Sequence, residues 1–139
     1  MRATLFDLVV SGFLATFVLT VERTAPNGSA VHPAAIRRAL AYIDEHLAEP
    51  FTVADVAAAA RVSVRGLHGA FRRDLGVTPM GYVLAARLAA VREELAGADA
   101  TTGVTVAEVA HRWGFGHLAR FAARYRAVYG ENPSQTLRR

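Results

Sequence analysis

The chain has 139 residues, of which 53% are hydrophobic and 20% are charged, so it can bury a core for one ordinary domain or two very small ones. It has no cysteine, which excludes a disulfide framework, a zinc–thiolate site and a thiol nucleophile. Its 16 basic residues are all arginines, and the net charge of +4 with a pI near 10.3 permits a polyanionic partner without requiring one.

The first element along the chain is an almost wholly apolar segment at residues 5–21, LFDLVVSGFLATFVLTV. We favour a helix or strand that packs on protein, because an apolar helix without a polar face needs a partner. A membrane span or a signal sequence is an alternative, although the segment is short, contains Asp7 and is preceded only by Arg2. Disorder is a further alternative. Residues 24–32, TAPNGSAVH, are predicted to be a linker.

The second element is an amphipathic helix predicted over residues 33–47. Its apolar positions recur at helical spacing, and charged residues occupy the opposite face. The predicted inward positions are Ile36, Leu40, Ile43 and Leu47. No strand pattern follows residue 32, so the chain is predicted to be all-α from this helix onward.

An internal repeat organises the remainder of the chain. The string TVADVA, which begins at Thr52, returns as TVAEVA, which begins at Thr105, 53 positions later. Further along, LGVTP matches YGENP at an offset of 54, so one residue is inserted in the central turn of the second copy. The repeat predicts two similar units at 52–79 and 105–133.

Each unit has the pattern of a helix-turn-helix. In the first unit, Thr52 and Asp55 form a predicted capping box, Ser63 caps the second helix and Gly76 ends it; the capping box recurs at Thr105. The predicted turns are Arg61-Val62 and Gly114-Phe115-Gly116. The predicted buried positions are Val53, Val56, Ala57, Ala60, Val64, Leu67, Ala70, Phe71 and Leu75, then Val106, Val109, Ala110, Leu118, Phe121, Tyr125 and Val128.

Between the two units, residues 79–96 form a predicted long helix with Pro79 near its start, and residues 97–103 form a predicted loop. The sequence thus predicts an all-α fold in two parts. An apolar N-terminal segment with its linker occupies 1–32. Two helix-turn-helix subdomains joined by the long linker helix form a bipartite domain at 33–139.

The apolar, turn and cap residues together make two extended motifs. Those of the first unit are Ser63-x3-Leu67-x3-Phe71 and Gly76-x-Thr78-Pro79-x2-Tyr82-x4-Arg87. Those of the second are Val106-x2-Val109-Ala110-x3-Gly114-Phe115-x5-Phe121-x3-Tyr125-x4-Gly130-x2-Pro133-Ser134. With these motifs, residues 33–139 resemble the DNA-binding domain of AraC/XylS-type transcription regulators. The resemblance implies that each subdomain places its second helix, the recognition helix, in the major groove of DNA.

The second unit departs from the family pattern in two places. Gly116 and His117 replace the polar pair that usually caps the recognition helix, so we expect this helix to fray at its start. Leu118 and Ala119 stand where long polar base readers are common, so we expect this unit to rely more on the DNA backbone. Family members usually carry an effector-binding or dimerisation domain before this one, and the apolar residues 1–23 resemble the tail of such a region.

Residues that would touch DNA lie near the N-terminal ends of the two recognition helices, on the side away from the apolar positions. Arg65 and Arg120 are the predicted base readers, because a guanidinium can donate to guanine O6 and N7, and Ala123 suits a thymine methyl. Phosphate contacts are predicted for Arg73, Arg112 and Arg126. The predicted DNA-binding set is Ser63, Arg65, Gly66, His68, Gly69, Arg72, Arg73, His117, Ala119, Arg120, Ala123 and Arg124. For any one arginine, a solvated helix surface is the alternative.

Other notable side chains are predicted to have structural roles. Trp113 and Phe115 are expected to pack in the core and the turn rather than to stack on bases. Arg87 either braces the two units through an ion pair or contacts a phosphate. The remaining histidines, predicted as surface or helix-cap residues, are His32, His46 and His111.

Catalysis is disfavoured, since the chain has neither HExxH nor GxSxG and its five histidines lack metal-ligand spacing. We therefore expect no catalytic site, no metal and no cofactor. The predicted function is a sequence-specific double-stranded DNA-binding transcription regulator, activator or repressor, in the cytoplasm. Its two recognition helices would enter successive major grooves, about 34 Å apart, on a non-palindromic site.

A protein-interaction or dimerisation module is the alternative function, as is a fragment that depends on a missing effector-binding domain. On either view, residues 1–23 would pack in a homodimer or against a sensor domain. Contact with RNA polymerase is implied by the family resemblance alone. A membrane partner is disfavoured.

Overall fold

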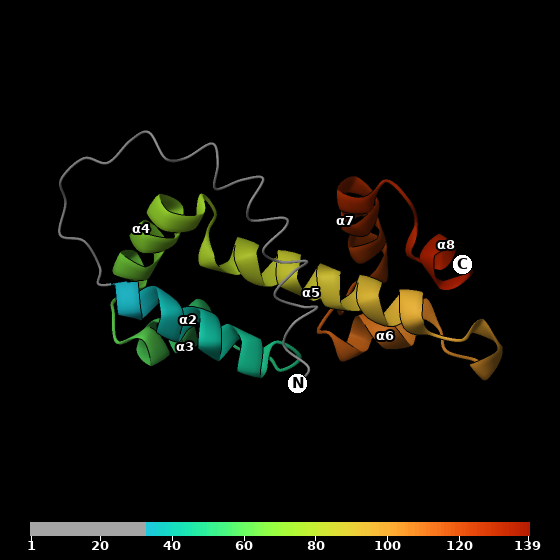
Figure 1. Ribbon diagram of the computed structural model, residues 1–139, viewed down its shortest axis with the longest axis horizontal. Coiled ribbons are helices and arrows are strands. Elements are labelled where there is room, and N and C mark those ends of the chain that lie inside the picture. The colour runs from blue at the N-terminus through green and yellow to red at the C-terminus, as the bar shows by residue number, and fades with distance from the viewer. Residues whose placement is uncertain (1–32) are drawn as a thin grey trace. The chain divides into compact units, whose positions relative to one another are not determined.

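The computed structural model describes residues 33–139, and within this range the chain folds into helices and turns without strands (Figure 1). This confirms the predicted all-α class. The predictions for the apolar segment 5–21 and the linker 24–32 fall outside the described residues. Among the helices from Pro33 onward, none is both long and apolar enough to cross a bilayer.

The predicted helices are present, and two short elements join them. In chain order the elements are α2 (Pro33–His46), α3 (Val53–Ala60), α4 (Val64–Leu75), α5 (Pro79–Gly97), a 3₁₀ turn η1 (Ala100–Thr102), α6 (Val106–Arg112), α7 (Leu118–Tyr129) and α8 (Pro133–Leu137). The turn η1 lies in the predicted loop, where the Asp99 carboxylate accepts from the Thr101 N–H at 2.9 Å. The helix α8 starts at Pro133, whose fixed φ suits a first helical position.

The chain divides into two compact units, with the boundary between Ala85 and Ala86, inside α5. We refer to the described residues before this boundary as the first unit and to those after it as the second unit. The predicted bipartite domain therefore consists of two units that each have a core of their own.

The first unit packs α2, α3 and α4 against one another (Figure 1). Its core contains Ile43, Val56 and Phe71, each with no exposed surface, and the Phe71 ring meets the ring of Tyr82 edge-on at 6.0 Å. Arg38 on α2 donates from Nη2 to the Ala60 carbonyl at 2.8 Å, which satisfies an orphan acceptor at the end of α3. Burial and capping thus fix the turn that leads into α4.

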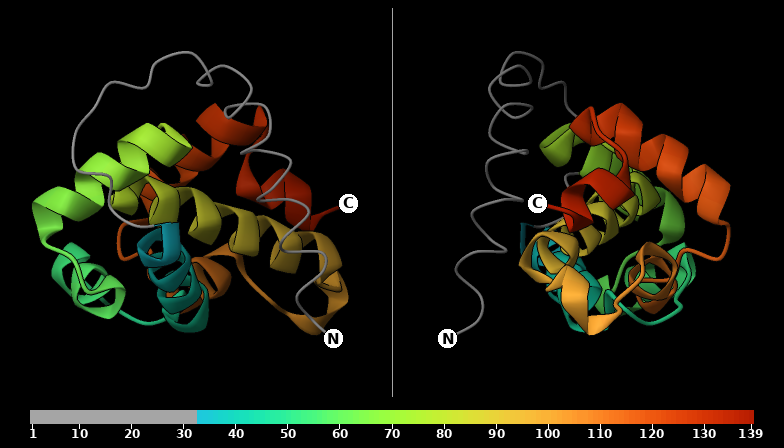
Figure 2. Two further views of the ribbon diagram at one scale, coloured as in Figure 1. Left: turned by 60° about the vertical axis from the view of Figure 1, so that its left-hand side comes forward. Right: turned by 90° about the vertical axis from the view of Figure 1, so that its right-hand side faces the viewer.

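The second unit packs α6, α7 and α8 together, and α7 and α8 lie side by side in both views of Figure 2. Phe121 and Tyr125 of α7 are buried, and the Phe115 ring of the preceding turn lies 4.8 Å from that of Phe121. Trp113 is half-buried and donates from Nε1 to the Glu94 carboxylate at 2.6 Å. Trp113 and Phe115 therefore pack in the protein, as predicted.

The helix caps confirm the register of the internal repeat. Thr52 and Thr105, 53 positions apart, each cap a helix through a complete capping box. Ser63 and His117, 54 positions apart, cap α4 and α7. The offset therefore changes from 53 to 54 within the turn that precedes the cap of α7, and Gly116 is the inserted residue.

The two turns differ in the residue that adopts left-handed backbone. Arg61 ends α3 with φ 61° and ψ 41°, and it is the only described residue other than glycine with positive φ. Gly114 takes the equivalent place in the second unit with φ 86°. Glycine adopts this conformation without steric cost, whereas an L-residue with a Cβ is strained by about 1–2 kcal/mol.

The prediction of burial is wrong for three residues. Val64 and Leu118 are each 39% exposed, and Val128 is 46% exposed. Val64 and Leu118 are the first residues of α4 and α7, one turn before the first buried residue of each stripe, and their side chains stay partly open to solvent. Val128 shares the helical spacing of Phe121 and Tyr125 but is the second-last residue of α7, past the buried part of the stripe. The apolar period therefore overestimates how far each buried face extends.

Candidate nucleic-acid interface

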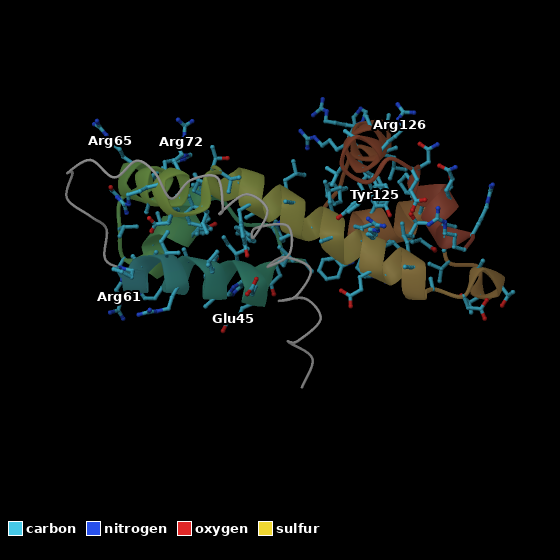
Figure 3. All side chains as sticks on the ribbon, turned by 45° about the horizontal axis from the view of Figure 1, so that its top comes forward. Glu45, Arg61, Arg65, Arg72, Tyr125 and Arg126 are labelled. Carbon is cyan, nitrogen blue, oxygen red and sulfur yellow. The ribbon has the colours of Figure 1, made fainter. Side chains whose placement is uncertain are left out.

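The helix α4 buries one stripe and exposes another. Leu67 and Phe71 are buried, whereas Arg65 and Arg72 are exposed on the opposite side with the half-buried His68 between them. The spacing of three and four residues puts these three polar side chains on one face. Figure 3 shows Arg65 and Arg72 projecting from the same side of α4.

Small residues flatten this outer face of α4. Gly66 is half-buried, Gly69 is exposed, and a Cβ added at Gly69 would meet nothing within 4 Å. Packing within the described chain therefore does not require glycine at position 69, and its lack of a side chain leaves room for a close ligand. The Ser63 hydroxyl caps the helix by accepting from the Gly66 N–H at 3.0 Å.

Two further arginines of the first unit, the predicted phosphate contact Arg73 and the turn residue Arg61, lie apart from this stripe or are paired. Arg73 is exposed and its Nε lies 3.1 Å from the Asp74 carboxylate, so part of its charge is neutralised. Arg61, at the turn before α4, lies on the other side of the first unit from Arg65 and Arg72 (Figure 3). The charged face of the first unit is therefore centred on Arg65 and Arg72.

The recognition helix of the second unit, α7, is exposed along most of its length. Phe121 and Tyr125 form the buried stripe. The predicted contact residues are all exposed; they are His117, Ala119, Arg120, Ala123 and Arg124. Arg126 is also exposed, and α7 carries no acidic residue. The outer face of α7 therefore offers cationic donors and small apolar groups.

The N-terminus of α7 is capped, contrary to the fraying expected from Gly116 and His117. The Nδ1 atom of His117 accepts a hydrogen bond from the Arg120 N–H at 3.3 Å. An imidazole nitrogen can replace the usual side-chain oxygen because its lone pair reaches the same orphan N–H. Since Nδ1 accepts, the neutral ring carries its proton on Nε2, which leaves a donor for an external acceptor.

The repeat shows which side chains of the two recognition helices are equivalent. At the offset of 54, Arg72 corresponds to Arg126, but Arg65 corresponds to Ala119. The sequence pattern predicts Arg126 only as a phosphate contact, outside the main contact set. The offset between repeats is the signal that would have placed it with Arg72.

Two further arginines predicted near phosphate are engaged within the second unit. Arg112 forms an ion pair with Glu94, which is also the acceptor for Trp113. Arg87 is half-buried, and its guanidinium packs against Gly114. A Cβ added at Gly114 would lie 3.5 Å from Nη1 of Arg87. Burial lowers the pKa of Arg87 from its usual value. These side chains support the turn before α7.

The other histidines do not form a cluster in the described residues. His46 ends α2, its Nδ1 lies 2.9 Å from the Tyr42 carbonyl, and its ring stacks on that of Tyr42 at 4.2 Å. His111 is exposed on α6, and His32 lies outside the described residues. His46 is therefore a helix-end residue and His111 a surface residue, as predicted.

Comparison with known sequences identifies this architecture. The family model described as a helix-turn-helix domain matches residues 56–139. Over 107 residues, 76% of this chain, the sequence is 44% identical to the probable thc operon regulatory protein of Rhodococcus erythropolis. It is 38% identical over 101 residues to XylDLEGF operon transcriptional activator 2 of Pseudomonas putida. The matches span 32% and 63% of those two proteins, so the chain corresponds to a part of each.

Solved structures agree with this assignment. A probable AraC family transcriptional regulator from Rhodopseudomonas palustris superposes with a TM-score of 0.68 at 36% identity, covering 75% of this chain and 94% of that one. The DNA-binding domain of AdpA, solved in complex with a target DNA, superposes with a TM-score of 0.65 at 28% identity, covering 75% of this chain and 89% of that one. The chain therefore belongs to the AraC family of helix-turn-helix proteins.

Proposed function

We propose that this chain binds double-stranded DNA sequence-specifically and regulates transcription, with α4 and α7 as recognition helices. The observation that carries the proposal is the duplicated helix-turn-helix, in which each second helix is capped and exposes arginines opposite its buried stripe. Such helices place their N-terminal residues against base edges in the major groove. The DNA-bound AdpA domain, which has this fold, supports the assignment.

Different residues would have different tasks on DNA. Arg65 and Arg120, in the first turn of their helices, would donate to guanine. Ala123 would contact a thymine methyl, while His68 and the Nε2 proton of His117 would donate to a base or a phosphate. Gly66, Gly69 and Ala119 would let the helices approach closely, with Ser63 and His117 holding the helix starts. Phosphate contacts are assigned to Arg72, Arg73, Arg124 and Arg126.

The two recognition helices are not equivalent readers. Arg65 stands at a position where the second helix has Ala119, so the two half-sites would differ in sequence. We therefore expect a non-palindromic site for one chain. The half-site read by α7 should depend on Arg120 and on contacts with the DNA backbone.

The partners beyond DNA are further proposals. Residues 1–23 would pack against a second copy of the chain or against a sensor domain, and an activator would also contact RNA polymerase in the cytoplasm. Sedimentation of the full chain at several concentrations separates the first two cases. A dimer that dissociates on dilution supports self-association, and a monomer supports docking on another domain.

The test of DNA binding is selection from sheared DNA of the source genome. The purified chain is mixed with the fragments, bound fragments are recovered at moderate salt, and they are sequenced. Two enriched half-sites would support reading by both helices. The affinity for the enriched duplex should fall steeply with salt, because arginines displace counterions from phosphates. No enrichment, together with a flat salt response on unselected genomic fragments, would reject DNA as the partner.

A further inference from the structure

The C-terminal part of the second unit contains a chain of polar contacts that involves α7. Tyr125 of α7 is fully buried, and its hydroxyl lies 2.7 Å from Oγ1 of Thr136 in α8, which is 5% exposed. The Thr136 hydroxyl donates to Oε1 of Glu131 at 2.8 Å. The other carboxylate oxygen of Glu131 lies 2.8 Å from Nη2 of Arg139. We call these four residues the Glu131 cluster.

The direction of each hydrogen bond in the Glu131 cluster follows from its chemistry. A carboxylate only accepts, so the single hydroxyl proton of Thr136 points to Glu131. Tyr125 must then be the donor to Thr136. Burial raises the pKa of the Tyr125 hydroxyl, which favours the protonated form that donates. The result is one continuous path from the buried face of α7 to a charge-assisted pair at the surface.

The first unit shows that the fold does not require this path. At the offset of 54, Phe71 takes the place of Tyr125 and Tyr82 that of Thr136. There the two rings pack edge-on at 6.0 Å, and Phe71 has no hydroxyl. Tyr82 also belongs to α5, a helix of 19 residues, whereas Thr136 belongs to α8, a helix of five. A helix of five residues is not stable alone, so its place depends on tertiary contacts.

The position of Tyr125 in α7 connects this cluster to the outer face of the helix. Arg124 and Arg126 are its neighbours in sequence and are both exposed. Figure 3 shows Tyr125 beneath the helix and Arg126 projecting from it. A hydrogen bond at the tip of a buried tyrosine resists rotation of the helix about its axis. Such rotation would move both arginines relative to a bound duplex, and small displacements weaken directional contacts.

We propose that Thr136 and Glu131 are positioning residues that set the orientation of α7 on DNA, acting through the hydroxyl of Tyr125. The proposal rests on the proposed function, because it concerns how α7 reads its half-site. It assigns a role in recognition to side chains on α8 and the preceding turn, which need not touch DNA.

The test combines protein variants with two duplexes. The first duplex is the one enriched from genomic DNA. The second is the same duplex with one half-site scrambled, namely the half-site at which Arg120→Ala loses discrimination. Affinities of the full chain are measured on both. The variant is Thr136→Val, which keeps the shape and removes the hydroxyl, and Thr136→Ser is the conservative rescue.

We expect Thr136→Val to bind the enriched duplex about 5-fold or more weakly, which is about the loss of one directional hydrogen bond to DNA from a rotated α7. On the scrambled duplex it should bind as tightly as the unmodified chain. Thr136→Ser should restore discrimination. Arg139→Ala should weaken binding to the enriched duplex more than the charge-matched Arg138→Ala, because Arg139 pairs with Glu131 and Arg138 is not part of the Glu131 cluster.

Three results would overturn the proposal. An equal loss on both duplexes would mean that Thr136 acts only on folding. Unchanged affinity of Thr136→Val on both duplexes would mean that the hydroxyl path does not position α7, while reading by α7 stands. If Arg120→Ala loses discrimination at neither half-site, α7 does not read bases, and the proposed function then fails for the second unit.

Discussion

Arg61 is predicted to destabilise the first unit, so replacing it with glycine should stabilise the protein. Its φ of 61° costs an L-residue about 1–2 kcal/mol, and glycine regains about 0.4–1 kcal/mol of freedom in the unfolded chain. The backbone hydrogen bond from the Arg61 N–H to the Ala58 carbonyl, 3.1 Å, is retained in glycine. The Arg61 side chain is exposed, so its removal should change the free energy of unfolding little. Arg61→Gly should therefore raise the free energy of unfolding by about 0.5–1 kcal/mol.

The assay is urea denaturation followed by circular dichroism, with thermal unfolding as a second measure. A gain of this size corresponds to a rise in Tm of about 2–8 °C for a domain of this size. Arg61→Ala is the matched control, because it removes the side chain and keeps the strain, and it should unfold like the parent chain. Gly114→Ala should lose about 1 kcal/mol or more, since its φ is 86°. If Arg61→Gly is no more stable than Arg61→Ala, backbone strain at this turn is not the reason.

Three further changes test the caps and contacts of the second unit. His117→Ala should lower the free energy of unfolding by about 1 kcal/mol, while His117→Ser, which can still cap α7, should keep most of it. Glu94→Ala removes the acceptor of the Trp113 indole and should lower the free energy of unfolding by about 1–3 kcal/mol. Unfolding can be followed by tryptophan fluorescence, and the control Glu93→Ala, at an exposed position, should leave stability unchanged. Hydrogen bonds from Thr105 lower the pKa of Glu108 below its usual 4.5. The stability they provide should be present above pH 4.5 and disappear as the pH falls through the lowered pKa, and Glu108→Gln should flatten this dependence.

The order and type of the main helices could be predicted from sequence because the signals are local. Capping boxes at Thr52 and Thr105, the cap at Ser63 and apolar residues at helical spacing each depend on residues within one turn of one another. The repeat adds independent support for these helices, since the same pattern of cap, apolar and turn residues does not easily arise twice by chance. These signals specify where a helix begins and which side it buries.

Features that depend on tertiary contacts could not be predicted in this way. The helix α8 has five residues and too little periodicity to be recognised, and the structure shows that Pro133 and Thr136 anchor it by burial. The exposure of Leu118 and Val128 depends on how far a neighbouring helix reaches. The hydroxyl path from Tyr125 to Glu131 joins residues whose types alone suggest no pairing.

The candidate interface was predictable in outline. The exposed stripe of α4 follows from its buried stripe, so Arg65 and Arg72 could be placed from the apolar period. The cap formed by His117 could not, because histidine is an uncommon cap and its ring geometry decides the contact. Placing Arg126 with Arg72 also requires the repeat offset of 54 to be applied to every position of the recognition helix.

The most direct test of the account is to repeat the genomic selection with Arg65→Ala and with Arg120→Ala. Each substitution should erase sequence preference at one half-site and leave the other unchanged. The loss should be about 1–3 kcal/mol at the preferred base, and the two half-sites should be different. If either variant instead loses affinity equally on every sequence, that arginine contacts only phosphate. If both do so, the central claim that α4 and α7 read bases is wrong.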